Sequence, residues 1–218
     1  MIKMIRTQDL QDRLQRADSW IKAARKLEPD QLHAAFIFYY IAFNSLYGRR
    51  KYEGTKTEAD QDLKAFLRRI KILHDLDIRN GSRILPQAIQ ACCESGGDLI
   101  KDFIPTARYW KRIAKAADIF NSQDTEAVGS ARKGQYEDFL HLVLQRLNVL
   151  RNQVFHGCVT YGAASKGVPT LKAGLAVLKE LVPAFYKLMD EYGDYAKWPP
   201  IPYPRLGSEA HPRIDEVS

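Results

Sequence analysis

Residues 135–157 combine strong helical periodicity with a stripe of polar side chains whose types suit acid–base chemistry. With about 100° between successive helical residues, the polar side chains align at spacings of three and four: His141, Gln145, Asn148, Asn152 and His156. Apolar side chains fall broadly on the opposite side: Phe139, Leu142, Val143, Leu147, Leu150 and Val154. Arg151 lies at the edge of the stripe. A solvated face normally carries Lys and Glu, so this stripe is unusual.

Two interpretations of the stripe stay open. A histidine side chain takes or donates a proton near neutral pH, and arginine offers a permanently charged fork that fits phosphate oxygens. His156 and Arg151 therefore predict proton transfer beside a phosphate. Alternatively, a histidine is electrostatically favourable near a helix C-terminus and can cap carbonyl groups there. In that case Asn148, Asn152 and His156 only close the helix.

The string from Leu150 to Gly157, LRNQVFHG, contains the pattern Arg-Asn-x-x-x-His. In this it resembles the HEPN superfamily, whose members are all-helical bundles with the motif at the end of a late helix. A second phrase, IAFNSLYG from Ile41 to Gly48, ends an early apolar helix and is similar to a phrase in related HEPN members. The resemblance extends over roughly residues 32–192.

The resemblance implies a HEPN-like helical bundle and a metal-independent endoribonuclease that needs no cofactor. RNA carries a 2'-hydroxyl beside each scissile phosphate, so removal of that proton can drive in-line attack on phosphorus. The products are then a 2',3'-cyclic phosphate and a 5'-hydroxyl. The expected catalytic residues are Arg151, Asn152 and His156. His156 moves the proton, Arg151 stabilises the phosphate charge, and Asn152 orients the imidazole or the phosphate.

HEPN proteins commonly place the motif at a dimer interface. The resemblance therefore implies a homodimer with a composite active site, in which two copies of Arg151 and His156 face one RNA strand. Many such proteins are toxins or phage-defence effectors, which implies an antitoxin or nucleotidyltransferase as a partner. A rival hypothesis is a protein with the same fold and no catalytic activity. It would be a HEPN module whose polar helix face binds a nucleotide or a partner protein.

Three basic clusters, residues 49–51, 68–71 and 108–112, are candidates for guiding RNA. The last mixes cations with aromatic rings as base-stacking grooves do, through Arg108, Tyr109, Trp110, Lys111 and Arg112. Solvated faces and buried rings explain these clusters equally well. Asn148 and Tyr47 are further candidate RNA contacts, although Tyr47 can equally be a packing residue.

Asn44 is a polar residue within an apolar helix. A buried amide without a partner costs about 1 to 3 kcal/mol. We therefore expect Asn44 to make a structural hydrogen bond rather than to act in catalysis, with the helix that carries the Arg-Asn-x-x-x-His motif as one candidate partner.

The whole chain is basic, with a formal net charge of +7 over 218 residues and a pI near 9.2. This surplus favours a polyanionic partner. Three cysteines, two of them adjacent, build neither a disulfide framework nor a zinc site. The first residues lack a signal-peptide core, and no apolar run approaches the about 20 residues of a membrane span. We expect a soluble cytoplasmic protein that does not contact membranes.

Periodicity and helix stop signals predict a single helical domain over residues 1–192 and a proline-rich, irregular extension over residues 193–218. Helices are expected near residues 9–27, 32–47, 59–76, 86–93, 106–120, 135–155 and 171–192. Pro183 predicts a kink or a break near Val182. Residues 121–134 are expected to form a polar loop outside the core. Gly157 is expected to end the helix over residues 135–155. The extension is expected to be frayed or to wrap on the domain through Trp198 and Tyr203.

Overall fold

The structure is a computed structural model that describes residues 5–48, 59–95, 127, 129–131, 133–157 and 168–201. Within these residues all regular secondary structure is helical and no strand occurs, which confirms the all-α class. The α-helices are α1 (Gln8–Arg25), α2 (Leu32–Tyr47), α3 (Ala59–Arg79), α4 (Ile84–Ser95), α7 (Glu137–Phe155) and α8 (Val168–Tyr192). A 3₁₀ helix, η2 (Gly193–Tyr195), follows α8.

Local signals in the sequence set the start of α1 and the end of α2. The Thr7 side chain accepts a hydrogen bond from the Leu10 main-chain N–H at 3.3 Å and so caps the start of α1. The Gly48 N–H donates to the Asn44 carbonyl oxygen at 2.9 Å at the end of α2. Helix α2 thus has the bounds that its apolar run and Gly48 predict.

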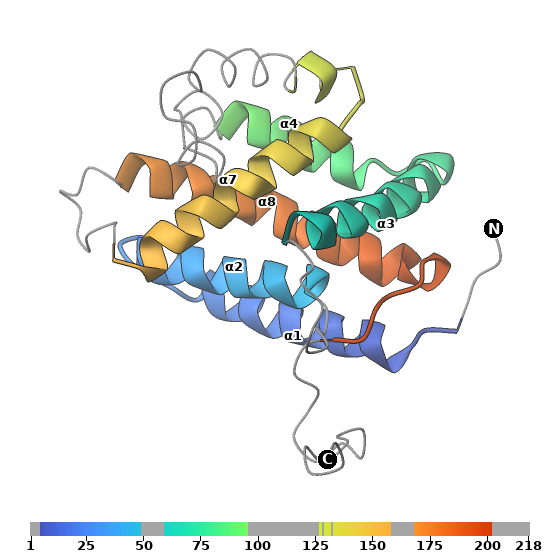
Figure 1. Cartoon of the computed structure of the whole chain (residues 1–218), viewed down its shortest axis with the longest axis horizontal. Helices are drawn as coiled ribbons and strands as arrows, with labels where there is room; N and C mark the ends of the chain where they lie inside the picture. Colours follow the sequence, from blue (N-terminus) through green and yellow to red (C-terminus); the bar gives the residue numbers. More distant parts are fainter. Residues whose placement is uncertain are drawn as a thin grey trace, which may run out of the picture.

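Helix α8 lies at the centre of the fold and contacts α1, α2, α3, α4 and α7. In Figure 1, α1 and α2 run side by side, and α7 crosses α8 at an angle. Aromatic rings fill the space between α2, α3 and α8: the Phe66 and Phe185 ring centroids are 5.4 Å apart, and those of Phe43 and Phe185 are 6.2 Å apart. The core therefore spans helices far apart in sequence.

Of the kink or break predicted near Val182, the break is wrong, because helix α8 continues through Pro183. An interior proline removes one helical hydrogen bond and costs about 3 kcal/mol or more. Its neighbours Val182 and Ala184 are both buried in the core. Because α8 contacts so many other helices, burial of its apolar residues offsets the lost hydrogen bond.

Gly174 allows α8 to approach α7 closely. A Cβ atom at this position would lie 2.5 Å from Cδ2 of Leu150 and 3.2 Å from Cε2 of Phe36. Such distances leave no space for a side chain without a shift of its neighbours. Gly174 therefore sets the position of Leu150, the residue just before Arg151.

A fully buried arginine, Arg13, joins three distant parts of the chain. Its Nη1 donates to the Leu46 carbonyl oxygen at 2.9 Å and to that of Gly48 at 2.6 Å, and its Nη2 donates to the Pro199 carbonyl oxygen at 2.8 Å. Burial lowers the pKa of Arg13 to about 10, although the negative charge of Asp9 opposes this. The guanidinium group ties α1 and the end of α2 to residues 196–201, which we call the C-terminal strap.

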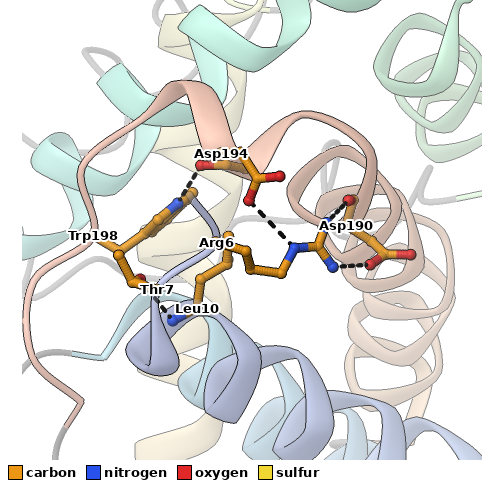
Figure 2. Close-up of polar contacts among 7 residues, drawn as sticks. Arg6, Thr7, Leu10, Asp190, Asp194 and Trp198 are labelled. Atoms are coloured by element: carbon orange, nitrogen blue, oxygen red, sulfur yellow. Dashed lines mark hydrogen bonds and ion pairs between the residues drawn. The ribbon is translucent and has the colours of Figure 1, made fainter. Parts of the chain in front are cut away.

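The strap and the end of α8 are also tied down by side-chain contacts, shown in Figure 2. Trp198 is buried, and its Nε1 donates to the Gly193 carbonyl oxygen at 2.9 Å. Arg6 contacts Asp190 Oδ1 at 2.9 Å and Asp194 Oδ1 at 3.2 Å, and also donates to the Asp190 carbonyl oxygen. The predicted extension thus begins with packed residues, as far as Ile201. Tyr203 lies outside the described residues.

The segment expected to be a polar loop contributes to the core. Residues 129–131 are helical, and Ala131 is buried in the main hydrophobic cluster, which corrects the expectation for this part of residues 121–134. Residues 121–126 and the helix expected over 106–120 lie outside the described residues. Among the helices that are described, none is long and apolar enough to cross a membrane.

Candidate functional site

The candidate site lies at the C-terminal end of α7. The His156 main-chain N–H donates to the Asn152 carbonyl oxygen at 2.9 Å. Gly157 follows with a φ of 71°, a left-handed conformation that ends the helix as predicted. The main chain of His156 thus makes the cap, while the residue as a whole is exposed. The cap that the structure shows is therefore made by the main chain.

The Arg151 guanidinium group is held by one amide and two aromatic rings. Its Nη1 donates to Asn152 Oδ1 at 2.8 Å. Its Cζ lies 4.6 Å from the Phe155 ring centroid and 5.9 Å from that of Tyr40, distances at which a cation is attracted to a ring face. Arg151 Nε is buried and has no hydrogen-bond partner in the described part of the chain.

None of the ion pairs found among the described residues includes Arg151. Its positive charge is therefore not neutralised by a carboxylate there. An arginine that is partly desolvated and has no acidic partner is well prepared to bind an anion such as a phosphate group.

Tyr40 of α2 links that helix to the polar stripe of α7. Its hydroxyl group donates to Asn148 Oδ1 at 3.1 Å. Burial raises the pKa of both Tyr40 and Tyr47, whereas the positive charge of Arg151 lowers each of them. The Tyr40 hydroxyl therefore stays protonated near neutral pH and remains a donor to Asn148.

Sequence reasoning missed Tyr40 and singled out Asn44 instead. Asn44 is half-buried, so its amide does not face the full cost of burial without a partner. The polar link from α2 to α7 is made by Tyr40, one helical turn before Asn44. A usable signal was present, because a tyrosine within an apolar helix needs a partner for its hydroxyl group.

Two further members of the predicted set are placed by the structure. Asn148 is half-buried and binds Tyr40, as described above. The Tyr47 ring stacks on Phe43 with centroids 4.5 Å apart and contacts Phe66 edge-on at 6.1 Å. These contacts place Tyr47 in the aromatic packing between α2 and α3.

The remaining part of the α7 stripe lies further from the helix end. Gln145 Nε2 and His141 Nε2 are 3.2 Å apart, one turn from each other. The apolar face differs from the expected one, since Leu140 and Leu144 are buried whereas Leu142 is only half-buried. Helix α7 contacts α2, α3 and α8, so its buried arc is wider and turned relative to the helical-wheel expectation.

The basic clusters have different positions. Arg69 donates to the Lys197 carbonyl oxygen at 2.8 Å, and its Cζ lies 6.0 Å from the Trp198 ring, so it anchors the C-terminal strap. Arg68 and Lys71 are exposed on α3. The cluster with Arg108, Trp110, Lys111 and Arg112 lies outside the described residues, as do residues 49–51.

Two cavities, of about 370 and 490 Å³, lie near α3, α4 and the beginning of α7. Residues 136–138 and Leu140 line the first, which places it roughly 20 Å along the α7 axis from Arg151. The candidate site therefore lies at the other end of this helix. The described residues contain no group of three or more His, Cys, Asp or Glu side chains that could hold a metal ion.

No protein-family model, curated protein or solved structure matches this chain.

Proposed function

We propose that the protein is a metal-independent endoribonuclease of the HEPN type, with Arg151, Asn152 and His156 as its catalytic residues. The observation that carries the proposal is the Arg151 guanidinium group, which has no acidic partner among the described residues and is turned towards Asn152 by a 2.8 Å hydrogen bond. Asn152 lies one helical turn before the exposed His156.

In the proposed reaction the 2'-oxygen of RNA forms a bond to phosphorus while the bond to the 5'-oxygen breaks. His156 takes the proton of the attacking 2'-hydroxyl group. Arg151 stabilises the negative charge that develops on the non-bridging phosphate oxygens. The leaving 5'-oxygen takes up a proton, so the products are a 2',3'-cyclic phosphate and a 5'-hydroxyl.

This reaction favours two copies of the site. One imidazole cannot at the same moment accept the first proton and supply the second. A homodimer in which two α7 ends face one RNA strand offers a second His156 as the acid. Dimerisation is thus part of the proposal. Like the proposed activity, it is inferred from the Arg-Asn-x-x-x-His motif.

The test incubates the purified full chain with a mixed single-stranded RNA in the presence of EDTA. We expect cleavage that leaves cyclic phosphate ends, detected by mass spectrometry. A His156→Ala variant should lose about 100-fold or more of the rate, the usual contribution of a general acid or base. An RNA with one 2'-deoxyribose should resist cleavage only at the phosphate next to that sugar, where the attacking 2'-hydroxyl group is missing.

The matched control is His141→Ala, which removes the histidine inside α7, about 20 Å from the helix end, and should retain activity. Equal rates for wild type and His156→Ala would overturn the nuclease proposal. The polar end of α7 would then be a binding surface only.

A further inference from the structure

Phe155 is an aromatic residue that the fold leaves in solvent. Its exposed fraction is 52%. The other large hydrophobic side chains exposed in the described residues are all isoleucines: Ile5, Ile72 and Ile78. Full burial of a phenylalanine side chain contributes about 1.5 to 3 kcal/mol, so the exposed ring forgoes part of that stabilisation.

The position of this ring relates it to the candidate site. Its centroid lies 4.6 Å from Cζ of Arg151, and the next residue is His156. A nucleotide has an anionic phosphate and an aromatic base. The end of α7 presents a cation that lies over an aromatic ring, and the ring is still about half exposed. A cation together with an exposed ring matches both groups.

We propose that Phe155 is a stacking platform for an unpaired RNA base next to the scissile phosphate, so that the site selects single-stranded RNA. The inference rests on the proposed ribonuclease function and names its substrate class. Within a duplex, each base is stacked on its neighbours and is not free to lie on a protein ring. A single strand can place one base on Phe155 while its phosphate reaches Arg151.

A second copy of the chain is the other possible occupant of the Phe155 ring. An apolar protein contact over the ring would further desolvate the adjacent Arg151 guanidinium group, which has no carboxylate partner in the described residues. Burying a charge without a partner is costly. RNA covers the ring and supplies an anion together, so the geometry favours RNA.

The test measures binding rather than cleavage. The probe is a single-stranded RNA with 2'-O-methyl riboses, which cannot be cleaved by 2'-hydroxyl attack, and with one 2-aminopurine whose fluorescence falls on stacking. Wild type and Phe155→Trp should both bind the probe and quench its 2-aminopurine fluorescence. Phe155→Leu, which keeps an apolar side chain without a ring, should bind about 5- to 150-fold more weakly, the usual effect of losing one base stack.

Two controls complete the design. Ile78→Ala removes an exposed apolar side chain on α3 and should leave the affinity unchanged. The probe annealed to its complement should bind wild type and Phe155→Leu equally. Circular dichroism of each variant checks the helical fold, and Phe155→Ala provides a second loss-of-ring variant.

Equal binding of the single strand by Phe155→Leu and wild type would overturn the platform. So would a loss of dimers in Phe155→Leu, measured by light scattering, with no change in RNA affinity. Ring-dependent binding by a protein that cleaves no RNA would support the platform and refute the nuclease. Cleavage at the same rate by wild type and Phe155→Leu, on single-stranded and paired RNA alike, would support the nuclease and refute the platform.

Discussion

The Tyr40 hydroxyl group donates a hydrogen bond to Asn148 Oδ1 at 3.1 Å and so joins the middle of α2 to α7. The same tyrosine ring lies 5.9 Å from the Arg151 guanidinium carbon. One buried side chain therefore fixes the register of two helices and contacts the residue proposed to bind phosphate.

Tyr40→Phe should lower the free energy of unfolding by about 1 kcal/mol, because it removes the partly buried hydrogen bond to Asn148 and keeps the ring. Urea unfolding of Tyr40→Phe, Asn148→Ala and the double variant gives a double-mutant cycle. Residues in direct contact should show a coupling of at least about 0.5 kcal/mol. Strictly additive effects would show that the link does not contribute to stability.

The stability of the protein should fall steeply at alkaline pH. Burial raises the pKa of Tyr40, whereas a tyrosine in the unfolded chain ionises near pH 10, about its ordinary value. Above that pH the unfolded state binds fewer protons than the folded state, so stability decreases as pH rises. Tyr47 has a raised pKa as well and adds to the same trend.

Urea unfolding at a series of pH values tests this prediction. Between pH 9 and about 11, on either side of the ordinary tyrosine pKa, wild type should lose more stability than Tyr40→Phe. The variant has no ionisable group at position 40. Parallel curves would contradict the prediction.

Arg13→Met should destabilise the protein by about 3 kcal/mol or more, because the buried carbonyl oxygen of Leu46 and the partly buried one of Pro199 lose their donor. The exposed Arg25, in the last turn of the same helix, offers a matched control. Arg25→Met should cost less than about 0.5 kcal/mol. Chemical denaturation followed by circular dichroism compares the two, and similar costs would show that the buried contacts of Arg13 are not needed.

Gly174→Val should destabilise the protein by about 1 to 3 kcal/mol, the usual cost of overpacking a core. The new side chain pushes against Leu150 and Phe36, so it should also move Arg151 and reduce RNA cleavage. A Cβ atom at Gly129 would have no atom of the described residues within 4 Å, so Gly129→Val is the control. Thermal unfolding and a cleavage assay measure both effects, and an equal response at the two positions would contradict the close approach.

The sequence predicts helices well where apolar periodicity and a stop signal coincide. Helix α2 has the expected bounds, because its apolar run ends at Gly48. Helix α8 shows where local rules leave alternatives open, since Pro183 predicts a kink or a break and stands inside a continuous helix. Contacts with other helices decide that outcome, and they depend on the whole fold.

The same distinction holds at the candidate site. The spacing of Asn152 and His156 follows from helical geometry and could be predicted. The pairing of Tyr40 with Asn148 joins residues 108 positions apart, and a single sequence does not reveal which polar groups meet across two helices. The exposure of Phe155 likewise depends on how α7 is turned against α2, α3 and α8.

The three-way contact of Arg13 has a consequence for the timing of biosynthesis. Helix α1 is translated before the strap, because chains emerge from the ribosome with their N-terminal segments leading. The Arg13 guanidinium group nevertheless needs the Pro199 carbonyl oxygen as one of its acceptors. Helix α1 therefore completes its contacts only after translation has passed the strap, so a nascent chain that ends at α7 carries the Arg151 and His156 motif before the finished fold exists.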